Sequence, residues 1–300
     1  MMNRTVRLSG PIVVGADGSA GARAAATWGL QAADRHETSL ELWHALGLPD
    51  YYLGSVPPSD ELLRKVKNRG ETILREAADT VERAYGPVVR THISDDSAIP
   101  ALIEASGTAR LIVLGSTEHS RFTALFGGSV TTALAGHAHC PVVSVRGRTW
   151  DLPTAWRQPI VVGVDGSPAA EIALAAAFDE ACARGANLVA VHAWEDVSAS
   201  RSFGDPAGNY GWSAFTESAQ RMLAEQVSKF RDSYPDVEVH QVVVHDEPRQ
   251  ELLRWSVKAQ LVVVGSRGRG GFRGLLLGST GQSLVHHAAC PVLISRTADS

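Results

Sequence analysis

A glycine-rich segment in the second half of the chain combines the residue types that bind phosphate. It reads Gly265-Ser266-Arg267-Gly268, followed by nine residues (RGGFRGLLL) and then by Gly278-Ser279. Because glycine has no Cβ, the backbone there can adopt positive φ and bring its amide groups against phosphate oxygens. Arg269 and Arg273 join Arg267 in supplying positive charge that would offset a polyphosphate. The segment therefore predicts a phosphate-binding loop.

The end of this segment is also suited to an anion. Gly278, Ser279 and Thr280 open a stretch with helical periodicity, and the first amides of a helix are unpaired and lie at the positive end of its dipole. A flexible linker is the alternative interpretation, but the position between an apolar strand and a helix start disfavours it. The loop has no lysine and no G-x-G-x-x-G follows the first strand, so neither a P-loop hydrolase nor the usual dinucleotide fingerprint is indicated.

The corresponding segment of the first half departs from this pattern at one position. Glu118 stands where the second glycine would be, although Gly128-Ser129 still closes the segment. A carboxylate directed at a polyphosphate is repelled, but a metal ion between them would reverse that effect, and His119 and Arg121 offer compensating donors. Binding by the first half therefore stays open at this point.

Acidic and histidine residues recur at equivalent strand ends. Asp17 and Asp165 follow the first strand of each half, where they would contact a ligand or cap the next helix, and neither is assigned a catalytic role. His44 and His192 end the second strand of each half and are expected to be hydrogen-bonded core residues. The three cysteines cannot all pair and none lies in a C-x-x-C spacing, so neither a disulfide framework nor a metal site is predicted.

These motifs occur twice because the chain contains an internal repeat. PIVVGADGSA from Pro11 recurs as PIVVGVDGSP from Pro159, an offset of 148, and LIVLGS from Leu111 recurs as LVVVGS from Leu261, an offset of 150. A nearly constant offset indicates a duplicated domain with one short insertion. We expect a first domain at residues 1–147, a linker at 148–158 and a second domain at 159–300.

Strands and helices alternate in each half. The strands predicted in the second half are Ile160–Val164, Leu188–Ala193, Val237–Val244, Leu261–Val264 and Val292–Ser295. The predicted helices are Ala169–Ala183, Ser213–Ser233, Arg249–Val257 and Thr280–His287. Strands rich in Val, Ile and Leu are covered on both faces, so each half is predicted to be a Rossmann-like α/β domain with a doubly wound, five-stranded, mostly parallel sheet. Ligands bind such sheets at the carboxyl ends of the strands, where the glycine loops and aspartates lie.

Composition narrows the class of protein. The 300 residues are 44% hydrophobic and 20% charged, as in ordinary globular domains, and the formal net charge is −4. That charge offers no basic field to attract nucleic acid or anionic lipid. No apolar run approaches the roughly 20 residues of a membrane span. We therefore expect a cytoplasmic protein with neither nucleic-acid nor membrane partners.

The spacing G-x-x-G, nine residues, G-S/T after the fourth strand resembles the ATP-binding motif of the universal stress protein family, and in particular its tandem-domain actinobacterial members. The resemblance implies ATP as the cofactor, with Mg²⁺ carried by the triphosphate. It places the adenosine beside Gly163, Val164 and Asp165, with Ala193 against the adenine. Val264 to Gly268 would lie under the ribose and phosphates.

Loop chemistry and resemblance together define the expected nucleotide-binding residues. In the first half they are Gly15, Ala16, Asp17, Ala45, Gly115, Thr117, Glu118, His119, Arg121, Gly128, Ser129 and Val130. In the second half they are Gly163, Val164, Asp165, Ala193, Val264, Gly265, Arg267, Gly268, Arg269, Gly270, Gly271, Gly278, Ser279 and Thr280.

The main hypothesis is an ATP-binding regulatory protein of stress responses, such as growth arrest, hypoxia or dormancy, rather than an enzyme. A slow ATPase or nucleotidyl transferase, with Asp165 or Glu118 holding a metal, is one alternative, and a nucleotide-independent interaction module is another. The resemblance also implies pairing of domains through the last strands, Val142–Val145 and Val292–Ser295, and we expect a homodimer with a further, unidentified protein partner.

Overall fold

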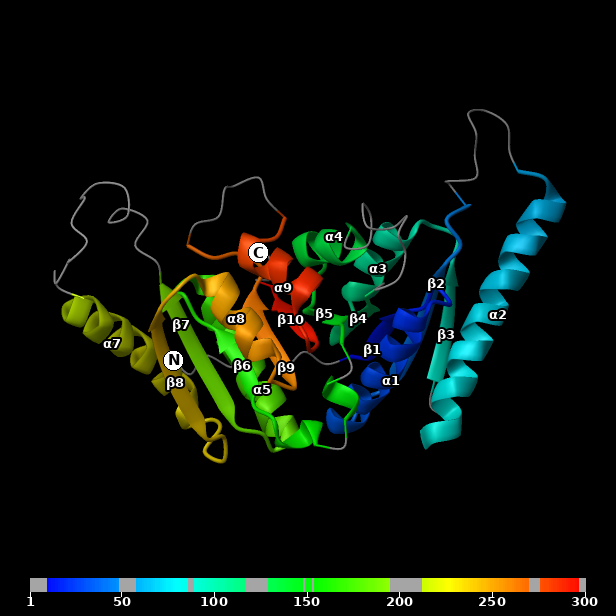
Figure 1. Ribbon diagram of the computed structural model, residues 1–300. Coiled ribbons are helices and arrows are strands. Elements are labelled where there is room, and N and C mark those ends of the chain that lie inside the picture. The colour runs from blue at the N-terminus through cyan, green and yellow to red at the C-terminus, as the bar shows by residue number, and fades with distance from the viewer. Residues whose placement is uncertain are drawn as a thin grey trace. The chain divides into compact units, whose positions relative to one another are not determined.

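The chain forms two compact α/β units in the computed structural model (Figure 1). The structure describes residues 10–48, 58–85, 89–116, 129–147, 149–152, 154–194, 212–269 and 276–296. Unit 1 ends at Arg146 and unit 2 begins at Gly147. Each unit contains a five-stranded sheet in which every pair of neighbouring strands is parallel.

Unit 1 has the strand order β3-β2-β1-β4-β5. Its strands are β1 (Ile12–Gly15), β2 (Leu40–Ala45), β3 (Val89–Ser94), β4 (Leu111–Gly115) and β5 (Val142–Val145). Ile12 pairs with Leu40 on one side and with Leu111 on the other, so the direction of winding reverses at β1. In open parallel sheets such a reversal is where ligands bind, at the carboxyl ends of the strands.

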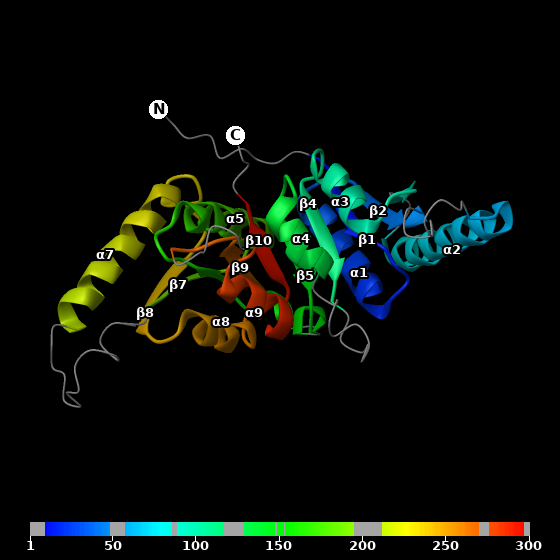
Figure 2. The same ribbon diagram turned by 90° about the horizontal axis from the view of Figure 1, so that it is seen from above.

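Helices cover both faces of the unit 1 sheet. They are α1 (Ala20–Arg35), α2 (Asp60–Tyr85), α3 (Ala98–Ser106) and α4 (Ser129–His137). Helix α1 contacts α2, whereas α3 contacts α4, and Figure 2 shows α1 and α3 on opposite sides of the strands. The central strands are consequently buried on both faces, with Ile12, Val14 and Ile112 fully inaccessible to solvent. The continuous apolar runs of these strands result from this double covering.

Unit 2 repeats this architecture in the order β8-β7-β6-β9-β10. Its strands are β6 (Ile160–Gly163), β7 (Leu188–Trp194), β8 (Val239–His245), β9 (Leu261–Gly265) and β10 (Val292–Ser295). Its helices are α5 (Pro168–Arg184), α7 (Trp212–Arg231), α8 (Pro248–Ser256) and α9 (Ser279–His287), preceded by the short 3₁₀ helices η2 (Thr149–Asp151) and η3 (Ala155–Arg157). The predicted fold class is confirmed, and the predicted elements of this half differ from the observed ones only at their ends.

Unit 2 also contains a buried ion pair between two positions of α5. Arg184 Nε donates to Glu180 Oε2 at 2.9 Å, and Arg184 Nη1 donates to Gln260 Oε1 at 3.2 Å. Gln260 Nε2 in turn donates to the carbonyl of Gln158, which directly precedes Pro159 and β6. The corresponding α1 positions in unit 1 are Ala32 and His36. This network therefore ties the start of β6 to helix α5.

No helix within the described residues combines the length and apolarity needed to cross a membrane.

Candidate functional site

A cavity of about 250 Å³ lies in unit 1 at the carboxyl ends of β1, β2 and β4. Among its lining residues are Gly15, Ala16, Asp17, Ala45, Gly115 and Val130. All six were expected from the sequence to contact a nucleotide, and they come from three strands and the first turn of α4. The fold thus brings together residues that are up to 115 positions apart in the sequence.

The remaining walls of the cavity were not expected from the sequence. Their residues are Ala22, Trp43, His44, Ala98, Ala101, Leu102, Leu114 and Thr131. Most are apolar, as in sites that hold a flat organic group. Helix α3 supplies three of them because its apolar face packs over the sheet beside β2. The periodicity of α3 was the available signal, but it predicts only burial and not exposure to a cavity.

Trp43 is the largest residue of the cavity wall, and its ring is held by two neighbours. The indole stacks on His92 with ring centroids 4.7 Å apart, and its Nε1 donates to Glu41 Oε2 at 3.2 Å. In unit 2 the position is occupied by Val191, because Trp43 pairs with Gly15 and Val191 pairs with the equivalent Gly163. The aromatic wall is therefore a property of unit 1.

The turn after the first strand has the same geometry in both units. Asp17 Oδ1 accepts a hydrogen bond from the Ser19 amide at 2.9 Å, and Asp165 Oδ1 accepts one from the Ser167 amide at 2.9 Å. The intervening Gly18 has φ +82°, a conformation that favours glycine. The serine, rather than the aspartate, is the N-cap of the following helix. Each aspartate is thereby left to shape the turn beside the expected ligand.

In unit 2 the glycine loop closes onto Asp165. The Arg269 amide donates to Asp165 Oδ2 at 2.9 Å, so both carboxylate oxygens accept hydrogen bonds from backbone amides. A Cβ added to Gly268 would lie 2.5 Å from Asp165 Oδ2, which is far too close for a carbon atom. A side chain at this position would therefore force the Asp165 carboxylate or the loop to shift. The Arg269 guanidinium lies beside Gly166.

Two other glycines of the motif serve different purposes. A Cβ on Gly265 would lie 2.9 Å from Ala169, so this glycine allows β9 to pack closely against the first turn of α5. Gly278 is the N-cap of α9, with φ −65° and ψ 156°, and as a glycine it supplies no side-chain cap to the helix. A Cβ there would come no closer than 3.7 Å to any described atom. Neither the backbone conformation nor the described surroundings require glycine at position 278.

Other expected residues lie around the same edge of unit 2. Gly163 ends β6, Val164 is buried, and Ala193 lies near the end of β7, while Val264 is buried in β9. The Arg267 side chain is exposed, and Ser279 and Thr280 begin α9. Ser129 begins α4 in unit 1. Thr117, Glu118, His119, Arg121, Gly128, Gly270 and Gly271 lie outside the described residues.

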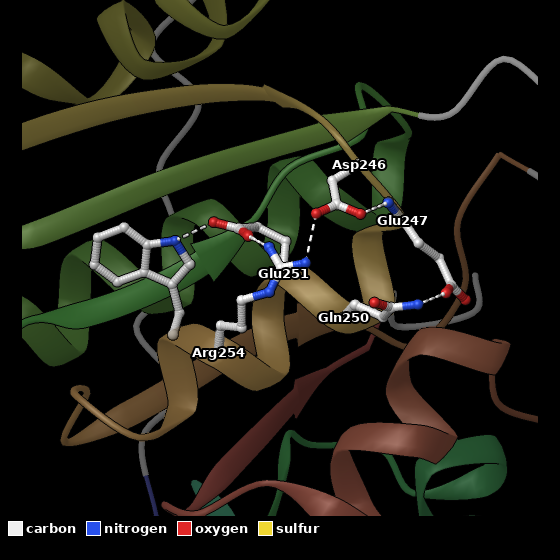
Figure 3. Close-up of polar contacts among 6 residues, drawn as sticks. Asp246, Glu247, Gln250, Glu251 and Arg254 are labelled. Atoms are coloured by element: carbon white, nitrogen blue, oxygen red, sulfur yellow. Dashed lines mark hydrogen bonds and ion pairs between the residues drawn. The ribbon is translucent and has the colours of Figure 1, made fainter.

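Helix α8 of unit 2 and the residues just before it carry a polar network (Figure 3). Helices α3 and α8 are equivalent, because Ser106 and Ser256 make the same contacts, and Glu251 therefore stands where unit 1 has Ala101. Trp255 Nε1 donates to Glu251 Oε1 at 2.9 Å, and Arg254 pairs with both Glu251 and Asp246.

The interaction between Asp246 and Arg254 shifts both pKa values in the direction that stabilises the charged side chains. The hydrogen bond from Arg254 holds the pKa of Asp246 below its usual value, and the bond to Asp246 raises the pKa of Arg254. Both groups are therefore ionised at neutral pH. Glu251 thus places a charged residue where unit 1 has the cavity-lining Ala101.

Thiol chemistry is not available at the buried cysteines. Burial raises the pKa of Cys140 and of Cys290 to about 12, so both remain protonated at neutral pH. Within the described ranges, no three His, Cys, Asp or Glu residues gather in a way that could hold a metal ion.

Comparison with known proteins agrees with the fold and the motif. The model of the universal stress protein family matches residues 9–146 and 157–296. The chain is 39% identical over 289 residues to universal stress protein Rv2623 of Mycobacterium tuberculosis, covering 95% of this chain and 96% of that protein. It is 36% identical over 292 residues to a universal stress protein of Mycolicibacterium smegmatis, covering 95% and 96%.

The solved structures include a universal stress protein from Archaeoglobus fulgidus that has the same fold. It superimposes with a TM-score of 0.69 over 96% of this chain and 97% of that chain, at 20% sequence identity. The family model and the mycobacterial relatives confirm the resemblance that the loop spacing indicated. The chain belongs to the universal stress protein family, as a member with two tandem domains.

Proposed function

We propose that this protein binds ATP, one molecule at the carboxyl edge of each sheet, and acts as a nucleotide-dependent regulator in a stress response. The observation that carries the proposal is the unit 1 cavity of about 250 Å³, lined by six residues expected to contact a nucleotide. It lies where the winding of the sheet reverses, which is the place that α/β sheets of this kind use for ligands.

The size of the cavity suits the nucleoside part of ATP. Sites for small molecules span about 300–1,000 Å³, so this cavity, at about 250 Å³, is slightly smaller than that range and suits part of a nucleotide rather than all of it. Its apolar walls, including Trp43 and Leu102, would enclose the base. A triphosphate would extend beyond it towards the first turn of α4, where Val130 and Thr131 already line the cavity. Amides at a helix start stabilise such an anion.

Gly278 supports phosphate binding in unit 2. Because the described structure does not itself require glycine there, the absence of a side chain is explained by close approach of a ligand to the start of α9. Gly278 supplies no side-chain cap, which leaves the first amides of α9 to phosphate oxygens in this proposal. Arg267 and Arg269 lie on the same loop and would offset the charge.

The aspartate chemistry favours retention of ATP over rapid hydrolysis. Both oxygens of Asp165 accept amide hydrogen bonds, so this carboxylate holds the loop and is not poised as a general base. Mg²⁺ would enter with the triphosphate, coordinated by phosphate oxygens, and would neutralise part of their charge. A bound nucleotide would then change the surface that the protein presents to a partner.

Nucleotide extraction tests this proposal. Protein purified without added nucleotide is denatured, and the supernatant is chromatographed; we expect an adenine nucleotide, and we expect added MgATP to raise the melting temperature of nucleotide-free protein. Asp165→Ala should reduce the rise in melting temperature, whereas Asp232→Ala, at an exposed position, should not. Recovery of no nucleotide, together with an unchanged melting temperature, would refute the proposal.

A further inference from the structure

A histidine side chain holds the peptide in front of the strand-end aspartate in both units. His44 Nδ1 lies 2.6 Å from the carbonyl oxygen of Ala16, and His192 Nδ1 lies 2.7 Å from that of Val164. In each case the histidine is 28 residues from its acceptor. Because a carbonyl oxygen only accepts, Nδ1 must carry the proton in both histidines. The same bond occurs in both units although the neighbouring Trp43 of unit 1 is replaced by Val191 in unit 2, which indicates a shared requirement.

These bonds complete the fixation of the residue that follows the first strand. The Ala16 amide donates to the carbonyl of Trp43 at 2.8 Å, and the Val164 amide donates to that of Val191 at 2.9 Å. The amide of this residue is therefore held by the second strand, and its carbonyl is held by the histidine at the end of that strand. The imidazole thus supplies this carbonyl with a hydrogen-bond donor at the point where the strand pairing ends.

Fixing this carbonyl also fixes the aspartate. The peptide bond is planar and trans, so holding the carbonyl of Ala16 sets the direction of the Asp17 amide, which points the opposite way. The Asp17 carboxylate is then held by the Ser19 amide. His44 lines the cavity together with Ala16 and Asp17, so the held peptide forms part of the cavity wall.

We propose that His44 and His192 are positioning residues of the two nucleotide sites, each holding through Nδ1–H the peptide that presents the strand-end aspartate to the ligand. This inference rests on the nucleotide-binding function proposed above. It assigns to these histidines a role at the ligand site, whereas the sequence indicated only hydrogen-bonded core residues.

Variants that either keep or remove the N–H donor at this place test the inference. An asparagine amide can reach the place of Nδ1, whereas a leucine cannot donate, so His44→Asn and His192→Asn are compared with His44→Leu and His192→Leu. We expect each leucine variant to weaken MgATP binding at its own site by about three- to tenfold, the worth of one hydrogen bond. The asparagine variants should stay within about twofold of the unmodified protein, because the donor is retained.

The readouts separate this inference from the proposed function. If the unmodified chain does not bind MgATP, the proposed function fails and this role fails with it. If the unmodified chain binds but the asparagine and leucine variants bind equally, only the role of the histidines is overturned. Imidazole ¹⁵N NMR of the unmodified full chain without nucleotide requires no variant: protonated Nδ1 in both histidines is expected, and a neutral ring protonated only at Nε2 would contradict the proposal.

Discussion

At the scale of single residues, glycine has three distinct roles at the candidate site. Gly265 allows a strand to approach a helix, Gly268 avoids a collision with Asp165, and Gly278 leaves the start of α9 open. All three belong to one sequence motif, yet only the last is unexplained by the packing of the residues that the structure describes. Substitutions at these positions should therefore differ in whether they affect stability or ligand binding.

Gly268→Ala should weaken ATP binding in unit 2. The new Cβ would lie 2.5 Å from Asp165 Oδ2, so the carboxylate or the loop must shift and we expect the 2.9 Å bond from the Arg269 amide to be lost. Hydrogen bonds to charged groups contribute about 1.5–3 kcal/mol, so affinity at this site should fall about tenfold or more by isothermal titration calorimetry. Gly107→Ala is the control, since Gly107 has a helical φ of −66° and a Cβ there meets only Glu104 O, at 3.3 Å. Equal affinities of the two variants would disprove the role of Gly268.

Trp43→Val should weaken ATP binding in unit 1 by about tenfold, or 1.4 kcal/mol, through loss of apolar contact with the base. The substitution gives unit 1 the residue that unit 2 already has at Val191, so the strand should tolerate it. Trp156→Val, at a side chain that is 66% exposed, controls for the loss of one tryptophan. Titration with MgATP that shows no difference between these variants would remove Trp43 from the site.

At the scale of elements, the order of strands and helices could be predicted from local sequence patterns, whereas the residues that line the cavity could not all be predicted in this way. The strands around Ile160 and Leu261 were predicted because continuous apolar runs reflect burial on both faces, and the internal repeat supported each assignment. The site residues at the strand ends could also be predicted, because ligands bind parallel α/β sheets at the carboxyl ends of the strands. Trp43 and Ala101 were missed because their exposure to a cavity depends on how α3 packs over β2, which no local pattern encodes. The sequence also could not show that Ser19, rather than Asp17, caps α1.

The buried ion pair on α5 should behave as a coupled unit. Arg184→Met leaves the Glu180 carboxylate, 5% exposed, without its cationic partner, so the free energy of unfolding should fall by about 3–5 kcal/mol in urea denaturation. The double variant Glu180→Leu/Arg184→Met removes both charges and should recover most of that loss, since unit 1 folds with Ala32 and His36 at these positions. A double variant as unstable as the single one would show that the charges are not coupled.

At the scale of the whole molecule, duplication has preserved one fold while the site walls have diverged. Both units keep the strand-end aspartate, the following glycine and serine, and the histidine bond to the residue after the first strand. Trp43 and Ala101 line the unit 1 cavity, and the equivalent positions of unit 2 hold Val191 and Glu251. We therefore expect the two sites to bind nucleotide with different affinities. The homodimer, the cytoplasmic location and the protein partner stay predictions from sequence.

Cysteine reactivity should report the integrity of both cores at once. Burial raises the pKa of Cys140 and Cys290 to about 12, so at pH 8 these thiols are protonated as well as inaccessible, whereas Cys182 is exposed. A thiol-reactive chromogenic disulfide should titrate one cysteine in the native protein and all three after unfolding in guanidinium. Rapid reaction of two or three thiols in the native state would contradict the packing described for β5 and β10.

Equilibrium dialysis of the nucleotide-free chain against radiolabelled MgATP tests the central claim most directly, because it counts bound nucleotide without assuming hydrolysis or a partner. The structure predicts saturable binding that approaches two nucleotides per chain, one at the carboxyl edge of each sheet, with displacement by excess unlabelled ATP. Absence of saturable retention up to millimolar ATP would contradict it.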